Sequence, residues 1–197
     1  MKFKKIAITG HTKGLGNGLQ QHFLEHSLEV VGFSRSNNYD ISKIDVIDSI
    51  IEETLDYEVF INNAYYENHQ SIIASKWFES HKDKPHLLVN ISSIAPVTNS
   101  YLEPKYIHEK YSKHKSNLDK ISWDINFANC KARCINVSPA LIDTDMAHPL
   151  YIERFRNNGT VISVLEMSNT IADLIEQYFT SKWFVPHIYF INNDNFN

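Results

Sequence analysis

The sequence predicts a single α/β domain built on a doubly wound parallel sheet. Short apolar, β-branched runs alternate with segments whose apolar residues recur at helical spacing. This alternation continues along all 197 residues without an internal repeat or a break in composition. Strands separated by helices pair in parallel through right-handed crossovers, which places helices on both faces of the sheet. A chain of this length builds one sizeable core, so we expect one domain over residues 1–197.

The expected strands and helices follow from these two periodicities. The strands are predicted at 4–9, 29–34, 37–41, 58–62, 86–91, 133–138 and 187–191. The helices are predicted at 15–26, 44–55, 69–81, from the loop at 95–105 to about 129, and at 168–179 with Ser168 as its cap. Residues 37–41 follow the second strand so closely that no full helix fits between them. Residues 139–159 have no regular pattern, so a lid is expected at about 140–160.

Composition and charge exclude several classes of protein. Hydrophobic residues make up 43% and charged residues 21%, as in an ordinary globular domain. The net charge of −4 argues against a general nucleic-acid-binding protein, which needs a basic face. No apolar run has the length of a membrane span, and no signal-peptide core is present. Cys130 and Cys134 have no partners at metal-ligand spacing, so we expect free thiols, no metal and a cytoplasmic location.

A glycine-rich turn follows the first predicted strand, at residues 9–16. Gly10 allows a sharp turn, Gly14 allows close approach of the backbone to a pyrophosphate, and Gly16 allows the next helix to pack on the strand. Free N–H groups at the start of that helix then face the anion. A strand-to-helix turn without a ligand has the same pattern, so the turn needs support from other motifs.

Four further polar stretches supply that support, because each is predicted at the same edge of the sheet. They are residues 62–64, residues 90–93, residues 111–115 at the start of the long helix, and residues 139–146. The carboxyl ends of parallel strands form the ligand-binding edge of such a sheet. The sequence therefore predicts one site there.

Together these stretches resemble the short-chain dehydrogenase/reductase family, over Lys4 to about Ile191. The matching residues are Thr9, Gly10, Gly14 and Gly16 of T-G-x-x-x-G-x-G, Asn62, Asn63 and Ala64 of N-N-A-G, Ser93 at a strand end, Tyr111 and Lys115 of Y-x-x-x-K, and Pro139 and Thr144 of P-G-x-x-x-T. Tyr65 and Ala140 stand where the family has glycine. The resemblance implies a Rossmann-like fold and a nicotinamide-dependent oxidoreductase.

The predicted chemistry is proton transfer coupled to hydride transfer. Carbonyl reduction needs a proton donor to the nascent alkoxide, and Tyr111 suits this role. Lys115 lies one helical turn further on the same face, where its charge is expected to lower the pKa of Tyr111. The resemblance implies that Lys115 also holds the nicotinamide ribose and that Ser93 binds the substrate oxygen. It also implies an asparagine that supports a proton relay, for which Asn68 is the nearest match.

Two alternatives compete for the catalytic positions. Tyr106 and Lys110 also spell Y-x-x-x-K, but the apolar residues after Tyr111 and Lys115 have the helical phase usual for the family, which favours that pair. Ser92 competes with Ser93, the family's catalytic position.

The charges around the second strand favour NADP(H) over NAD(H). That strand ends at Ser34 and Arg35 without the acidic residue that binds ribose hydroxyls in NAD enzymes. Arg35 and Lys13 are suited to a 2′-phosphate. Asp40 resembles the aspartate that contacts the adenine amino group and equally fits a turn. The predicted cofactor-binding set is Gly10, Thr12, Lys13, Gly14, Leu15, Gly16, Ser34, Arg35, Asp40, Asn62, Asn63, Ala64, Tyr111, Lys115, Pro139 and Thr144.

The predicted function is an NADP(H)-dependent oxidoreductase that interconverts a carbonyl and an alcohol on a small molecule. The resemblance implies a homodimer or homotetramer. The alternative is a cofactor-binding sensor or scaffold of the same fold, because Tyr65 and Ala140 replace glycines beside the expected cofactor. His108 and His114 are expected to be exposed helix residues. Arg154 and Arg156 in the lid are interpreted either as binding an acidic substrate or as exposed surface charges.

Overall fold

A six-stranded parallel sheet forms the centre of the computed structural model, which describes residues 1–98, 108–147 and 161–190. The strand order is β2-β1-β3-β4-β5-β8. The strands are β1 (Lys5–Thr9), β2 (Glu29–Phe33), β3 (Val59–Asn62), β4 (Leu87–Ile91), β5 (Arg133–Pro139) and β8 (His187–Phe190). The predicted doubly wound parallel sheet is thus confirmed.

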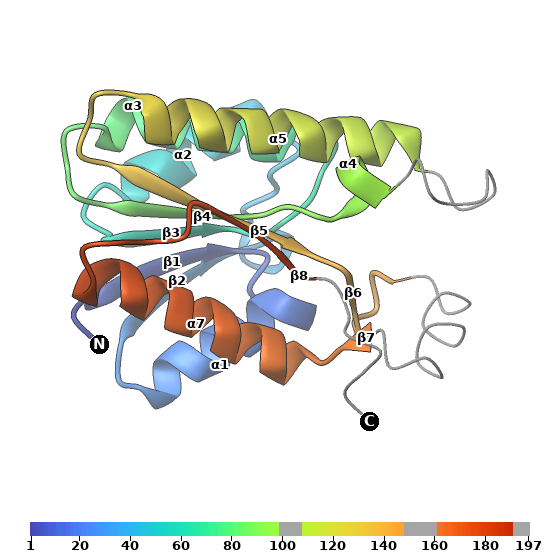
Figure 1. Cartoon of the computed structure of the whole chain (residues 1–197), viewed down its shortest axis with the longest axis horizontal. Coiled ribbons are helices and arrows are strands. Elements are labelled where there is room, and N and C mark those ends of the chain that lie inside the picture. Colours follow the sequence, from blue (N-terminus) through green and yellow to red (C-terminus); the bar gives the residue numbers. More distant parts are fainter. Residues whose placement is uncertain (99–107, 148–160, 191–197) are drawn as a thin grey trace.

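Helices cover both faces of this sheet (Figure 1). One face carries α1 (Gly14–Glu25) and α7 (Val164–Thr180). The other face carries α2 (Ile44–Glu53), α3 (His69–His81) and α5 (Glu109–Phe127), and the short helix α4 (Ala95–Thr98) follows β4. Within the described part of the chain, no helix combines the length and apolarity that crossing a membrane requires.

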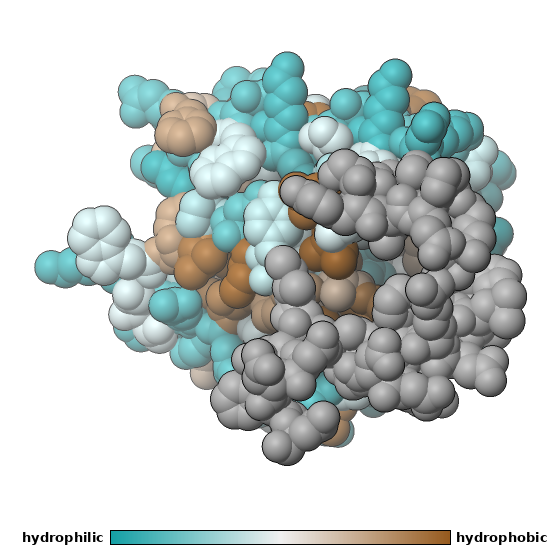
Figure 2. All heavy atoms as spheres, turned by 45° about the vertical axis from the view of Figure 1, so that its right-hand side comes forward, coloured by the Kyte–Doolittle hydropathy of each residue, from teal (hydrophilic) through white to brown (hydrophobic). Residues whose placement is uncertain are grey.

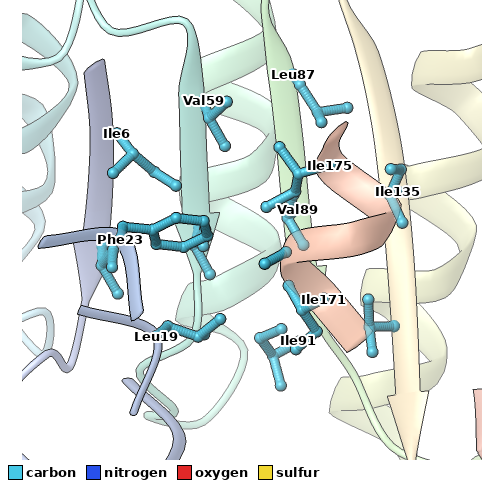
Figure 3. Packing of buried hydrophobic residues seen from close by; sticks show 14 of the residues in the cluster. Ile6, Leu19, Phe23, Val59, Leu87, Val89, Ile91, Ile135, Ile171 and Ile175 are labelled. Carbon is cyan, nitrogen blue, oxygen red and sulfur yellow. The ribbon is translucent and has the colours of Figure 1, made fainter. Parts of the chain in front are cut away.

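Successive strand residues feed two separate cores. Ile6 and Ile8 point to the α1–α7 face, whereas Ala7 between them packs on the opposite face. Figure 3 shows the first core, to which α1 contributes Phe23, on the side of Ile6, and α7 contributes Ile171, next to Ile91. Because both faces are buried, the strands contain continuous apolar runs.

The strand expected at residues 37–41 is absent, and this prediction is wrong. A 3₁₀ turn, η1 (Arg35–Asn37), follows β2 instead. The Asn37 side chain accepts a hydrogen bond from the Ser34 N–H at 2.8 Å and donates one to the Gly32 carbonyl at 2.7 Å. Asn38 then adopts a left-handed φ of 71°. These local hydrogen bonds turn the chain towards α2, so β2 is one of the two edge strands of the six-stranded sheet.

The start of the last helix was also wrongly predicted. α7 begins at Val164, and Ser163 caps it by accepting the Glu166 N–H at 3.1 Å, while the Glu166 carboxylate accepts the Ser163 N–H at 3.1 Å. Ser168, the expected cap, is buried inside the helix. The sequence pattern missed this reciprocal capping box.

The region between β5 and α7 is more regular than expected. The short strand β6 (Leu141–Ile142) pairs in parallel with β7 (Val161–Ile162). Residues 148–160 of the expected lid, including Arg154 and Arg156, lie outside the described residues. The loop at 95–105 was expected to be irregular, but its beginning forms α4, and the long helix is α5.

Candidate active site

The predicted motifs gather at the carboxyl edge of the sheet. These strand ends lie on the right of Figure 1, and Figure 2 turns that side forward. Apolar residues reach the surface in the middle of that face among polar ones. The edge holds the end of β1 with the glycine turn, the ends of β3, β4 and β5, and the first turns of α5.

The glycine turn has the geometry of a phosphate cradle. Gly10 and Gly14 have left-handed φ values of 72° and 52°. A Cβ at Gly16 would lie 2.2 Å from the Gly10 carbonyl oxygen, so no other residue fits there without displacing backbone. Lys13 caps α1 without a side-chain hydrogen bond, and the first turn contains no acidic residue. The first N–H groups of α1 therefore have no side-chain cap, as a site for a pyrophosphate requires.

Thr9 joins the end of β1 to the end of β3. Its hydroxyl accepts hydrogen bonds from the backbone N–H groups of Asn63 at 2.9 Å and Ala64 at 3.0 Å. The Asn63 side chain donates to the Thr9 carbonyl at 3.0 Å. The two motifs that the sequence places about fifty residues apart thus form one rigid corner.

The predicted cofactor residues around β2 lie beside this turn, because the Gly10 N–H donates to the Phe33 carbonyl at 2.7 Å. Lys13 and Arg35 are both exposed, and Ser34 is buried. Asp40 makes a turn: its carboxylate accepts the Ser42 N–H at 3.0 Å, which holds the pKa of that carboxyl below its usual value. Its contact with adenine stays a prediction.

The other predicted cofactor residues occupy different environments. Thr12 is exposed, and Leu15 is buried in the core, which leaves only its backbone for a ligand. Pro139 ends β5, and its carbonyl accepts the Ile94 N–H at 3.1 Å. The Thr144 methyl group lies 3.2 Å from the position of a Cβ at Gly14, so the segment after β5 reaches the glycine turn.

The two serines at the end of β4 have different partners. The Ser93 hydroxyl hydrogen-bonds to Tyr111, and it also accepts the Ala95 N–H at 3.1 Å. The Ser92 hydroxyl donates to the Asp119 carboxylate at 2.5 Å. Ser93 is therefore the serine that stands beside the predicted catalytic tyrosine.

Burial raises the pKa of Tyr111, and the hydrogen bond from Ser93 opposes that rise. The expectation that Lys115 lowers this pKa is wrong for the structure. Lys115 is itself 3% exposed, and burial lowers its own pKa to about 7. A buried amine without a charged partner in contact is a weak source of positive charge at neutral pH.

The Lys115 amine forms hydrogen bonds with two carbonyl oxygens. Its Nζ donates to the Gln70 Oε1 at 2.6 Å and to the Ile91 carbonyl at 2.7 Å. It lies 5.3 Å from the ring centroid of Tyr65 and 5.4 Å from that of Tyr111. Lys115 and Tyr111 therefore stand together.

The competing Y-x-x-x-K pair does not share this arrangement. Lys110 is exposed and forms an ion pair with Glu67. Tyr106 lies outside the described residues.

The Asn68 side chain contacts Asn117, and its part in the predicted relay stays a prediction. Asn68 occupies the N-cap position of α3 without a side-chain capping hydrogen bond, and its Oδ1 accepts a hydrogen bond from Asn117 at 3.2 Å. Gln70, which sequence reasoning missed, contacts Lys115 instead. The available signal was its position: Gln70 shares the buried face of α3 with Ile73 and Trp77, at helical spacing, although it is polar.

A cavity of about 500 Å³ opens beside Tyr111. Its lining residues are Tyr65, Tyr66, Glu67, His108, Glu109, Lys110, Tyr111 and His114. The ring of Tyr65 meets that of Tyr111 edge to face at 4.9 Å, and the Tyr65 hydroxyl hydrogen-bonds to His114 Nδ1 at 3.0 Å. His114 was expected to be exposed, but it is partly buried and lines this cavity.

Comparison with solved structures supports the same architecture. A short-chain dehydrogenase/reductase (glucose/ribitol dehydrogenase) from Brucella melitensis superposes with a TM-score of 0.77 at 15% identity, covering 98% of each chain. The fold is that of the short-chain dehydrogenases. The predicted family resemblance is thus confirmed at the level of fold, at low sequence identity.

Two further structures of this fold were determined with nicotinamide cofactors. The 3α-hydroxysteroid dehydrogenase from Pseudomonas sp. B-0831, complexed with NADH, has a TM-score of 0.72 at 18% identity and covers 95% of this chain and 94% of its own. A short-chain dehydrogenase from Burkholderia cenocepacia, in complex with NADP, has a TM-score of 0.72 at 18% identity and covers 96% and 88%. No family model matches the sequence, and no curated protein matches it.

The low pKa of Lys115 couples folding to pH. In the unfolded chain this amine has the ordinary lysine value of 10.5, so between about pH 7 and 10.5 the unfolded state binds more protons than the folded state. Raising the pH through this window therefore stabilises the wild type relative to Lys115→Met. Between about pH 7 and 10, we expect the difference in free energy of unfolding, wild type minus Lys115→Met, to increase by about 2–4 kcal/mol.

Urea denaturation of both proteins at several pH values measures this difference. If the difference in unfolding free energy between the two proteins stays constant from about pH 7 to 10, burial does not lower the pKa of Lys115.

Proposed function

We propose that the protein is an NADP(H)-dependent oxidoreductase that reduces a carbonyl on a small molecule to an alcohol, and the reverse. The observation that carries this proposal is the convergence of Ser93, Tyr111 and Lys115 beside a cavity, next to a glycine turn that leaves the start of α1 without a side-chain cap. The fold shared with dehydrogenases supports it.

The residues around the glycine turn fit a dinucleotide. The uncapped N–H groups of α1 suit the pyrophosphate, and the lack of a Cβ at Gly16 keeps the turn close to β1. Asn63, Ala64 and Thr144 border this turn. The cofactor, when bound, supplies or accepts the hydride.

Tyr111 acts as the acid in the reduction. Its raised pKa keeps the phenol protonated at neutral pH, and the phenol is the form that donates a proton to a carbonyl oxygen. Ser93 binds the same oxygen through its hydroxyl and orients Tyr111. Lys115, whose Nζ lies 5.4 Å from the centre of the Tyr111 ring, would hold the cofactor ribose. Asn68 is left out of this proposal because it contacts Asn117 instead of Lys115.

The preference for NADP(H) is carried by Arg35 and Lys13. Both side chains are exposed at the edge where β1 and β2 end, and no acidic residue occupies the end of β2. A 2′-phosphate carries close to two negative charges and forms charge-assisted hydrogen bonds with such cations.

A sensor or scaffold is the second candidate, and Tyr65 favours it. This ring stands where the resembling family has glycine and packs edge to face on Tyr111. The Tyr65 ring takes up space beside Tyr111 in which a reductase has to place its substrate. A protein that only binds the cofactor does not need this space. Turnover of a carbonyl panel with NADPH separates the two functions.

The proposed assembly is a homodimer or homotetramer formed through α5. This helix exposes Trp123 and Phe127, whose accessibilities are 40% and 81%, and their rings stack at 5.8 Å. Large apolar side chains exposed side by side on a helix are typical of subunit interfaces.

Tyr111→Phe tests the catalytic assignment. Removing the phenolic hydroxyl deletes the proton donor and leaves the ring packing intact, so we expect kcat for a carbonyl substrate to fall by about 100-fold or more. The measurement is the steady-state oxidation of NADPH. Tyr57→Phe, at the opposite end of β3, is the matched control and keeps wild-type turnover. Wild-type turnover in Tyr111→Phe refutes the assignment.

Arg35→Ala and Lys13→Ala test the cofactor preference. Each lost charge-assisted contact removes roughly 1.5–3 kcal/mol, so NADPH binding weakens about tenfold or more while NADH binding barely changes. Fluorescence titration of both cofactors measures this, with Lys120→Ala on α5 as the charge-matched control. Equal losses for NADH and NADPH mean that these side chains are plain surface charges.

A further inference from the structure

Gln70 has a side chain whose orientation is dictated by its surroundings. It is 2% exposed, and its Nε2 donates to the carbonyl oxygens of Asn62 at 2.8 Å and Ile91 at 3.1 Å. Turning the amide over would bring its oxygen against these two carbonyl oxygens and its NH₂ group against the Lys115 amine. The ends of β3 and β4 therefore aim the Gln70 Oε1 at Lys115.

Lys115 depends on this oxygen because its surroundings offer little else. Within the described part of the chain, its hydrogen-bond acceptors are the Gln70 Oε1 and the Ile91 carbonyl, and both are uncharged. Asp119, one turn along α5, favours the charged amine, but its carboxylate accepts hydrogen bonds from Ser92 and Asn136. On the side of the cavity, the rings of Tyr65 and Tyr111 face Lys115.

We propose that Gln70 is the positioning residue of this centre: its amide oxygen fixes the Lys115 amine beside Tyr111 and gives that amine an uncharged hydrogen-bond partner. The sequence analysis did not predict this role for Gln70. A part in turnover rests on the proposed carbonyl reduction, whereas the effect on Lys115 does not.

The choice of an amide has a chemical consequence. A carboxylate at this position would form a buried ion pair and hold Lys115 charged at all physiological pH values. The neutral amide accepts a hydrogen bond from the ammonium but brings no negative charge. Burial therefore lowers the pKa of Lys115 to about 7. The amine can then change its protonation state near neutral pH, next to the tyrosine that exchanges a proton with substrate.

The pair Gln70→Glu and Gln70→Met tests this role in the full-length protein. NMR titration of ¹³C-labelled lysine side chains reads the Lys115 pKa directly, and Lys115→Arg assigns its resonance. We expect Gln70→Glu to raise this pKa by about 1–3 units, because it adds an opposite charge in contact. Gln70→Met keeps the length of the side chain but removes the acceptor, so it lowers the pKa. Gln21→Glu, the same change on the exposed side of α1, leaves it unchanged.

A Lys115 pKa that matches the wild type in Gln70→Glu or in Gln70→Met overturns the proposal. The two variants shift the value in opposite directions, so loss of folding in one leaves the other decisive. Where turnover is established, the pH profile of kcat moves in the same direction as the Lys115 pKa. If the wild type reduces no carbonyl at all, the proposed function fails, and the titration still decides whether Gln70 controls Lys115.

Discussion

The approach of Gly16 to the carbonyl oxygen of Gly10 is the contact on which the carboxyl edge of the sheet depends. A Cβ at Gly16 would lie 2.2 Å from that oxygen. Because glycine has no Cβ, α1 can begin directly against the end of β1, and its free N–H groups then lie at the sheet edge. The Thr9 hydroxyl adds the end of β3 to the same corner. Backbone proximity therefore builds the cradle before any charged side chain contributes.

A second constraint is the burial of polar groups behind Tyr111. Lys115, Gln70 and Asn62 are all nearly inaccessible, and hydrogen bonds connect them to one another and to Asn90. Buried polar groups are mostly hydrogen-bonded inside a protein, and here these contacts join α3 and α5 to the ends of β3 and β4. Asn62 Oδ1 is an exception, with no hydrogen-bond partner among the described residues. The charged form of Lys115 is disfavoured by its surroundings, which costs stability at neutral pH. A buried ionisable group with a shifted pKa, held in a fixed position, is typical of sites where proton transfer occurs.

The sequence predicted the sheet, the helices on both faces and the glycine turn because local patterns determine them. Helix α3 was predicted with its observed bounds, His69–His81. The errors arose where side chains bond to nearby backbone. Asn37 redirects the chain after β2, and Ser163 caps α7 through Glu166, so hydrogen bonds of single residues outweighed the periodic pattern.

The site was predicted less completely than the fold. Motif spacing brought Ser93, Tyr111 and Lys115 to one edge, because each follows or faces a strand end. Gln70 and the Tyr65–His114 pair depend on how α3 and the segment before it pack against α5, and no local pattern encodes that packing. A polar residue on the apolar face of a helix was the one available sign of Gln70.

Calorimetric titration of NADPH into the full chain, with Gly16→Ala and Asn17→Ala as a matched pair, tests the central claim most directly. The account predicts saturable binding to the wild type and to Asn17→Ala, which changes a neighbouring residue of the same helix. It predicts at least about a hundredfold weaker binding to Gly16→Ala, whose methyl group forces α1 away from β1, with circular dichroism reporting that the fold persists. Failure of the wild type to bind, or equal affinity in both variants, would contradict the assignment of this edge as a dinucleotide site.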